Sequence, residues 1–215
     1  TAGSPDTAMS TNRQAATAAI EAAGIVAVIR IKDPAKLQAV VDAISEGGIR
    51  ALEVTMTVPG AIELIAGLAP KMPPGFLLGA GTVLDAATAL KVIDAGAQFI
   101  VSPVFRREVI EACHSRDVAV TPGCFTPTEI LDAWDAGADI VKVFPATALG
   151  PGYIKDVRAP LPQVINPLAA KRPSTFVTCA PRSINPLMGT SRGRLPIRQP
   201  PGCGALTRPN RARSG

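Results

Sequence analysis

EILDAWDAGADIVKVFPA, residues 129–146, contains one complete helix-to-strand unit. Its first half reads as a helix that ends at Gly137, where a left-handed C-cap needs a residue without a Cβ. Its second half is an apolar run of strand formers with one lysine, Lys142, near its centre. The stretch therefore predicts a helix followed at once by a buried strand, and it places a single cation on that strand.

The same pattern recurs along residues 13–150, about every 20–25 residues, which suits one strand and one helix per unit. The glycines predicted to end helices are Gly24, Gly48, Gly96 and Gly137. The six predicted strands cover residues 25–30, 51–56, 76–80, 99–102, 118–122 and 139–144. Alternating strands and helices imply an α/β fold with a parallel sheet covered by helices. No GxGxxG turn follows the first strand, so a (β/α)8 barrel of the TIM type is favoured over an open, doubly wound sheet.

The pattern stops after about Gln163. Residues 164–215 are rich in Pro, Arg, Ser and Gly and contain no Asp or Glu, so the formal net charge of +5 is due to this segment. We therefore divide the chain into a flexible N-terminus (1–12), a barrel domain (13–163) and an irregular basic tail (164–215). The last two strands of an eight-stranded barrel would be absent or altered. Because the excess of basic residues is confined to the tail, the domain is not predicted to bind nucleic acid.

Composition argues against a metalloprotein, a secreted protein and a membrane protein. The chain has 215 residues, 47% of them apolar, which suits one sizeable domain. Its four cysteines form no CxxC pair and it has one histidine, so we expect no metal site and a reducing cytoplasm. Residues 1–12 show no signal-peptide pattern, and the longest apolar runs have strand length, so no membrane association is expected.

Two predicted strands each carry one charged residue that would face the barrel interior. Side chains alternate between the two faces of a strand, which puts Lys142 and Phe144 on one inward face and Glu53 and Thr55 on another. Opposite charges in such positions are either a structural ion pair or a catalytic pair. In the catalytic reading, burial lowers the pKa of the lysine from its ordinary value, and the neutral amine attacks a ketone to form a Schiff base. The carboxylate would then move protons, and the protonated imine is the electron sink, so no cofactor is required.

Other polar residues lie where predicted strands end. Arg30 ends the first strand and is either an anion ligand or a solvated side chain. GAGTV, residues 79–83, places Thr82 beside glycines that allow close approach of a ligand or only make a turn. FTPTEI, beginning at Phe125, reads as a helix start with Thr126 as N-cap.

Five motifs in order resemble one known family: LEVTMT, GAGTV, GAQFIVSP, PGCFTPTE and VKVFPA. They are similar to the 2-keto-3-deoxy-6-phosphogluconate (KDPG) and 4-hydroxy-2-oxoglutarate (KHG) aldolases, with matching order and spacing from about Gly24 to Gln163. The resemblance implies a class I aldolase, a lyase on a (β/α)8 barrel that usually forms a homotrimer. Its small-molecule substrates would be 2-keto acids, either KDPG, cleaved to pyruvate and glyceraldehyde 3-phosphate, or KHG, cleaved to pyruvate and glyoxylate.

The resemblance also implies roles for individual residues. The Schiff-base lysine of the family falls on Lys142 and its acid/base glutamate on Glu53. The implied substrate contacts are Thr82, Pro103, Phe144, Arg30 and Thr55. One position departs from the family, which often reads E-V-T-x-R-T with the arginine near the substrate carboxylate, whereas this chain has Thr57 there. Carboxylate binding would then rest on backbone groups, on Thr82 or on Arg30.

The tail departs from the family as well. Where the family has a strand ending in Pro-Thr-Gly-Gly, and later a Gly-Ser pair, to bind phosphate, this chain has NPLAA at residues 166–170. The codons AAC CCA CTG GCG GCG encode this pentapeptide, and reading them two nucleotides later gives Pro-Thr-Gly-Gly. We therefore hypothesise that the sequence from about residue 165 onward is read out of frame. Repeated gene sequencing that shows an intact frame across codons 155–175 would remove this hypothesis.

Two other interpretations stay open on the sequence. The chain could be another phosphate-binding barrel enzyme, such as a phosphosugar isomerase or synthase, in which Lys142 is only a charge partner. Turnover that survives Lys142→Arg would favour that reading. Alternatively, the chain could be an inactive fragment with a basic tail, for which we expect salt-sensitive binding to polyanions that disappears on deletion of residues 164–215.

Overall fold

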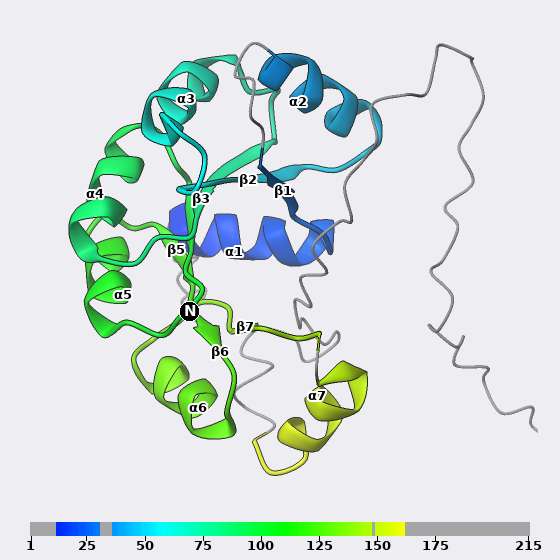
Figure 1. Cartoon of the computed structure of the whole chain (residues 1–215), viewed down its shortest axis with the longest axis vertical. Coiled ribbons are helices and arrows are strands. Elements are labelled where there is room, and N and C mark those ends of the chain that lie inside the picture. The colour runs from blue at the N-terminus through cyan, green and yellow to red at the C-terminus, as the bar shows by residue number, and fades with distance from the viewer. Residues whose placement is uncertain (1–11, 31–35, 148, 162–215) are drawn as a thin grey trace, which may run out of the picture. The chain divides into compact units, whose positions relative to one another are not determined.

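The computed structural model describes residues 12–30, 36–147 and 149–161 (Figure 1). All of the described residues belong to one compact unit. The predictions for residues 1–11 and for the tail 164–215 lie outside the described residues. The domain boundaries drawn from the sequence therefore stay predictions.

Strands and helices alternate through the described residues, as the sequence predicts. The strands are β1 (Ala27–Ile29), β2 (Ala51–Thr55), β3 (Leu77–Gly81), β4 (Phe99–Val101), β5 (Ala119–Thr121), β6 (Gly123–Cys124) and β7 (Lys142–Val143). The helices are α1 (Asn12–Ala23), α2 (Leu37–Glu46), α3 (Ala61–Leu68), the short 3-10 helix η2 (Ala69–Lys71), α4 (Ala86–Asp94), α5 (Arg107–His114), α6 (Pro127–Asp135) and α7 (Gly150–Arg158). Each of the six predicted strands is found.

All paired strands are parallel. One sheet has the order β1-β2-β3-β4-β5, and β6 pairs with β7 in a second, two-stranded sheet. Pro122 separates β5 from β6, because proline has no backbone N–H with which to continue the ladder. The strand direction continues across this break, since the amides of Lys142 and Phe144 donate to the carbonyls of Pro122 and Cys124, each at 2.9 Å.

The last strand is shorter than predicted. Residues 139–144 were expected to be extended, but only Lys142–Val143 form regular strand pairs. Asp139 accounts for the irregular start of this strand. Its carboxylate accepts the amide of Val120 at 3.0 Å, whereas in a regular ladder a backbone carbonyl would accept that amide. The amides of Asp139 and Ile140 both donate to the carbonyl of Val120.

The outer faces of the strands pack under helices α2 to α6, which follow one another around the sheet (Figure 1). The core between these layers is aliphatic and includes Val41, Leu52, Val54, Ile65, Leu78, Val92, Ile100, Ile110, Val120 and Ile130. On each strand these residues alternate with the inward-facing ones. Leu52 and Val54 belong to this core on the helix side of β2, and Glu53, which was predicted to face inward, lines the interior pocket.

Helix α1 packs against the first residues of the strands rather than in the outer helix layer. Ile20, 3% exposed, belongs to an interior cluster with Ala51, Phe99 and Ala119, which are the first residues of β2, β4 and β5. An ion pair between the guanidinium of Arg13 and the carboxylate of Asp139, at 3.3 Å, joins the helix to the segment that leads into β7. Helix α1 thereby covers the interior at the N-terminal ends of the strands.

Local signals at the ends of helices agree with the structure. The predicted N-cap of α6, Thr126, is confirmed as part of a capping box. Its hydroxyl accepts the amide of Glu129 at 3.2 Å, and the Glu129 carboxylate accepts the amide of Thr126 at 2.9 Å. The glycines predicted to end helices have positive φ values at Gly24, Gly48, Gly96 and Gly137. Both signals fix where a helix stops and the next strand begins.

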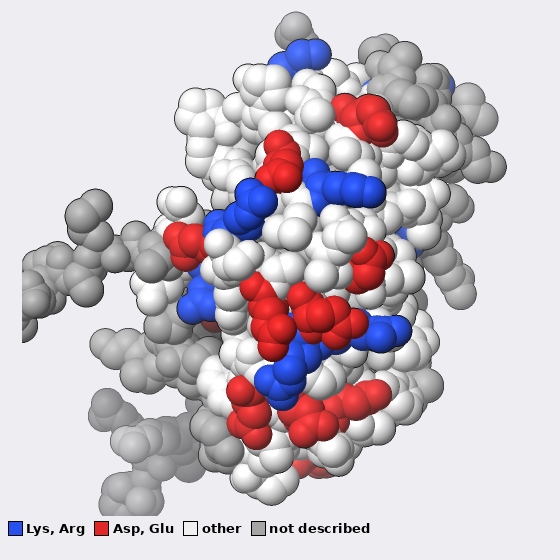
Figure 2. Space-filling view, turned by 90° about the vertical axis from the view of Figure 1, so that its left-hand side faces the viewer, with Lys and Arg blue, Asp and Glu red and all other residues white. Residues whose placement is uncertain are grey.

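The described surface carries charges of both signs. On the face in Figure 2, acidic and basic side chains are interspersed rather than gathered into a patch of one sign. One pair on the surface joins Arg116, in the turn after α5, to Asp94 of α4 at 2.8 Å. None of the helices in the described part of the chain is both long enough and apolar enough to cross a membrane.

Candidate active site

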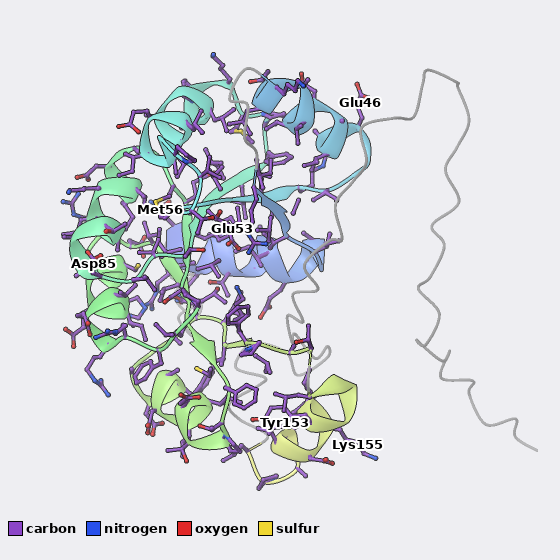
Figure 3. The ribbon with its side chains drawn as sticks, viewed as in Figure 1. Glu46, Glu53, Met56, Asp85, Tyr153 and Lys155 are labelled. Atoms are coloured by element: carbon purple, nitrogen blue, oxygen red, sulfur yellow. The ribbon has the colours of Figure 1, made fainter. Side chains whose placement is uncertain are left out.

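A pocket in the interior contains both charged residues singled out from the sequence. It encloses about 320 Å³ of space, part of it open to solvent, and it is lined by Ile20, Val26, Glu53, Phe99, Val101, Thr121 and Lys142. Glu53 comes from β2 and Lys142 from β7, so two segments far apart in the sequence meet here. Figure 3 shows Glu53 in the interior, beside helix α1, whose Ile20 forms part of the same wall.

Lys142 is held in surroundings that disfavour its charge. Its side chain is nearly buried, with the residue only 8% exposed. Burial lowers the pKa of Lys142 from its ordinary value of 10.5, the carboxylate of Glu53 opposes this shift, and the positive charge of Arg30 adds to it. A larger fraction of this amine is therefore neutral near pH 7 than for a solvated lysine, and the neutral form is the nucleophile.

Glu53 responds to the same pocket in the opposite sense. The residue is 3% exposed, and burial raises the pKa of its carboxyl, while the charges of Lys142 and Arg30 partly lower it. None of the ion pairs within 4.0 Å among the described residues joins Glu53 to Lys142. The two groups thus interact across the pocket without direct contact, which leaves space for a ligand between a nucleophile and an acid/base group.

Phe144 is the aromatic neighbour of the lysine. The Nζ atom of Lys142 lies 4.8 Å from the centroid of the Phe144 ring, a cation–π distance. Phe144 is two residues after Lys142 on the same chain segment and is 37% exposed. The ring is therefore partly exposed to solvent, and it offers the ammonium form of Lys142 a cation–π contact.

The glycines of the GAGTV segment have a different role from the one expected. The sequence suggested that they admit a ligand or make a turn, but in the structure they admit side chains of the protein itself. A Cβ on Gly79 would overlap the ring of Phe99, and a Cβ on Gly81 would overlap the carboxylate of Glu53. Gly81 therefore provides the space in which the Glu53 side chain lies.

Gly81→Ala is expected to push the Glu53 carboxylate out of place. Overpacking of a buried site costs about 1–3 kcal/mol of unfolding free energy, so we expect Gly81→Ala to be less stable by about that amount. Gly67→Ala in α3 is the matched control, because a Cβ there meets nothing within 4 Å, and it should raise stability slightly. Urea unfolding measures both effects, and unchanged stability of Gly81→Ala would contradict this placement of Glu53.

The other predicted contacts are placed around the pocket rather than in its lining. Arg30 is exposed just after β1, and its charge reaches both Glu53 and Lys142. Thr82 follows β3 with φ 60°, a left-handed conformation that is strained for a β-branched residue and that recurs at functional sites. Pro103 follows β4, and its carbonyl packs against Gly123, where a Cβ would overlap it.

The hydroxyl of Thr55, a predicted substrate contact, has a partner within the protein. It is fully buried, and its hydroxyl is hydrogen-bonded to the hydroxyl of Thr57 at 2.7 Å. Thr57 stands where the related family often has an arginine. The short bond between the two hydroxyls gives Thr55 a structural partner at the end of β2, beside the strand position that carries Glu53.

Sequence reasoning missed the rest of the lining. Thr121 lies on the inward face of β5, opposite Val101 in the register, and the alternation that identified Glu53 and Lys142 would have identified it too. Ile20 and Val26 carry no such signal, because only the tertiary position of α1 brings them to the pocket. Among the residues that the structure describes, no group of three or more His, Cys, Asp or Glu is placed to hold a metal ion.

Comparisons with known proteins all point to one family of aldolases. The family described as KDPG and KHG aldolase matches residues 17–169. A probable 2-dehydro-3-deoxy-6-phosphogalactonate aldolase of Rhizobium meliloti is 38% identical over 64% of this chain and 65% of its own length. A 2-dehydro-3-deoxy-phosphogluconate aldolase of Treponema pallidum is 40% identical over 59% of this chain and 58% of its own. The chain thus spans about two thirds or less of the length of these relatives.

A solved structure agrees with these relatives. A KDPG aldolase of Legionella pneumophila, with pyruvate captured as a covalent carbinolamine intermediate, superposes with a TM-score of 0.64 at 33% identity, covering 69% of this chain and 72% of that one. This likeness confirms the predicted α/β barrel fold class. The family match covers more than half of the chain and includes the segments that carry Glu53 and Lys142. The chain therefore belongs to the KDPG and KHG aldolase family.

Proposed function

We propose that the protein is a class I aldolase that forms a Schiff base between Lys142 and a 2-keto acid and breaks the bond between C3 and C4. The observation that carries this proposal is the nearly buried Lys142 amine, with a lowered pKa, in one pocket with the Glu53 carboxyl. The carbinolamine reported for the Legionella relative is the intermediate that such an amine would form. Lys142 has the role of nucleophile and Glu53 that of acid and base.

Imine formation takes two steps. The lone pair of the neutral amine forms a bond to C2 of the keto acid, the C=O π electrons move to the C2 oxygen, and that oxygen takes a proton from the Glu53 carboxylic acid. The Glu53 carboxylate then takes one proton from nitrogen, which gives the neutral carbinolamine. Glu53 returns this proton to the C2 hydroxyl, which leaves as water while the nitrogen lone pair forms the C=N bond of the protonated imine.

Cleavage uses the imine as its electron sink. The Glu53 carboxylate removes the proton of the C4 hydroxyl, the C3–C4 bond breaks, and its electron pair becomes the C2–C3 double bond of an enamine as the imine nitrogen is neutralised. The aldehyde leaves with C4 as its carbonyl carbon. Protonation of C3 by the Glu53 acid restores the imine, and addition of water releases pyruvate and the free amine.

The substrate class follows from the relatives and from the charges near the pocket. Relatives are named for both the gluconate and the galactonate epimers, so we propose a 2-keto-3-deoxy-6-phospho sugar acid, or the shorter 4-hydroxy-2-oxoglutarate. Arg30, with Thr82, is proposed to bind the substrate carboxylate. Pro103 and Phe144 are proposed to border the ligand. A homotrimer in the cytoplasm is the proposed form and location of the enzyme.

A pyruvate-release assay on the two six-carbon phosphates and on 4-hydroxy-2-oxoglutarate tests this function. We expect release from at least one of them, and the ranking identifies the substrate. The assay should be run on the chain as given and with the C-terminal reading frame repaired, because the out-of-frame hypothesis predicts weaker use of phosphorylated substrates without repair. A folded protein that releases pyruvate from none of them, in either form, would contradict the proposal.

The rate of imine formation is expected to depend on pH through Lys142. Because burial lowers the pKa of this amine, the rate of trapping with pyruvate and borohydride should rise with pH and reach half of its plateau below pH 10.5, the ordinary value. The same shift acts on stability: between the lowered pKa and 10.5 the unfolded chain binds the extra proton, so the Lys142 contribution to the free energy of unfolding rises with pH. A half-plateau at or above pH 10.5 would contradict the burial effect.

A further inference from the structure

The buried polar side chains of this protein fall into two groups. Six are buried among the described residues: Thr17, Glu53, Thr55, Ser102, Thr121 and Lys142. Three of them have hydrogen-bond partners within the chain. The hydroxyl of Thr17 donates to the carbonyl of Arg13 at 2.9 Å, the Thr55 and Thr57 hydroxyls share a bond of 2.7 Å, and Ser102 donates to the carbonyl of Val104 at 2.7 Å.

The other three are the polar residues that line the pocket. No described residue hydrogen-bonds to the side chains of Glu53, Thr121 or Lys142, and all three face the same space. The polar atoms of these three side chains are not among the fully buried atoms that lack a partner. They are therefore reachable from the pocket, and a ligand there can take up their hydrogen bonds.

Thr121 lies on the chain segment that neighbours the strand of Lys142. It is 8% exposed and lies at the end of β5, and the amide of Lys142 donates to the carbonyl of the next residue, Pro122, at 2.9 Å. The two side chains thus come from adjacent chain segments and face the same interior. A keto acid joined to the lysine nitrogen at C2 carries an oxygen on that carbon, within the space that Thr121 borders.

We propose that Thr121 is a third catalytic residue, whose hydroxyl donates a hydrogen bond to the C2 oxygen of the keto acid attacked by Lys142. This inference rests on the proposed Schiff-base function and assigns a residue that the motif resemblance left without a role. As the C=O bond opens, negative charge grows on that oxygen, and a preorganised donor in an apolar pocket stabilises it. The hydroxyl keeps its own proton; the proton that the oxygen gains comes from Glu53.

Thr121→Val tests the inference, because valine keeps the shape and removes only the hydroxyl. We expect the rate of pyruvate trapping at saturating pyruvate to fall about 10- to 100-fold. The melting temperature should stay nearly the same, since no hydrogen bond among the described residues is lost with this hydroxyl. Thr121→Ser keeps the hydroxyl and should trap within about threefold of the unchanged protein. If Thr121 had a purely structural role, Thr121→Val would lose stability together with activity. Slower trapping at an unchanged melting temperature therefore indicates a catalytic role.

Thr17→Val is the matched control, since it removes a buried hydroxyl that already has a partner in α1. It should lower stability slightly and leave trapping unchanged. Equal trapping by Thr121→Val and the unchanged protein would overturn the inference while leaving the Schiff-base function intact. Equal losses of rate and stability in Thr121→Val and Thr121→Ser would overturn it in favour of a structural role. If the folded, unchanged protein traps no pyruvate, the proposed function fails, and this inference fails with it.

Discussion

Lys142→Met is expected to abolish pyruvate release, lowering the rate by at least about 10⁴-fold. Methionine has nearly the length of lysine and suits an apolar pocket, but it has no nitrogen to form the bond to C2. The same change should stabilise the protein at pH 7, because burial lowers the pKa of Lys142 and the charged form therefore destabilises the folded state. Activity and stability should thus move in opposite directions, as measured by the pyruvate assay and by urea unfolding.

Lys155 provides the control for this variant. It lies on α7, is exposed, and is labelled in Figure 3 on the outer side of that helix. Lys155→Met removes the same charge from the protein and should leave pyruvate release unchanged. Substantial turnover by Lys142→Met would contradict the Schiff-base assignment and would favour an enzyme in which this lysine is only a charge partner.

Glu53→Gln is expected to lower pyruvate release about 10²- to 10⁴-fold, because glutamine keeps the shape of the side chain but neither gives nor takes the proton. Imine formation should survive more than cleavage does. The carboxylate of Glu53 opposes the lowered pKa of Lys142, so its loss should move the pH at which trapping reaches half of its plateau further down. A pH profile of trapping separates this electrostatic effect from the loss of acid/base catalysis.

The control for Glu53 is Glu46, an exposed residue at the end of α2 that is also labelled in Figure 3. Glu46→Gln makes the same chemical change far from the pocket, and both the rate and the pH profile should match those of the unchanged protein. An unchanged pH profile in Glu53→Gln would show that this carboxylate does not act on the pKa of Lys142. Pyruvate release by Glu53→Gln at the rate of the unchanged protein would remove the acid/base role given to this carboxyl.

Strand alternation explains why the two central residues could be predicted from the sequence. The period of two puts Glu53 and Lys142 on inward faces whatever the details of packing, and parallel strands bring those faces into one interior. The helix-ending glycines and the Thr126 cap are equally local signals. The same reasoning would have found Thr121, whose strand follows the same alternation.

Other features depend on tertiary contacts that no local pattern records. The space that Gly81 leaves for Glu53 depends on the register between β2 and β3, and the register is not set by either strand alone. Ile20 enters the lining because α1 lies against the N-terminal ends of the strands, whereas its amphipathic pattern suits the outer layer as well. The early break in the last strand comes from one side chain, Asp139, that takes a backbone amide.

The most direct test of the central claim is mass spectrometry of the protein after treatment with pyruvate and borohydride. The structure predicts one reduced pyruvate per chain, on the peptide that contains Lys142, with none on the Lys142→Met variant. A folded sample with no adduct, or with adducts spread over exposed lysines such as Lys155 and none on Lys142, would contradict the claim that this buried amine is the nucleophile.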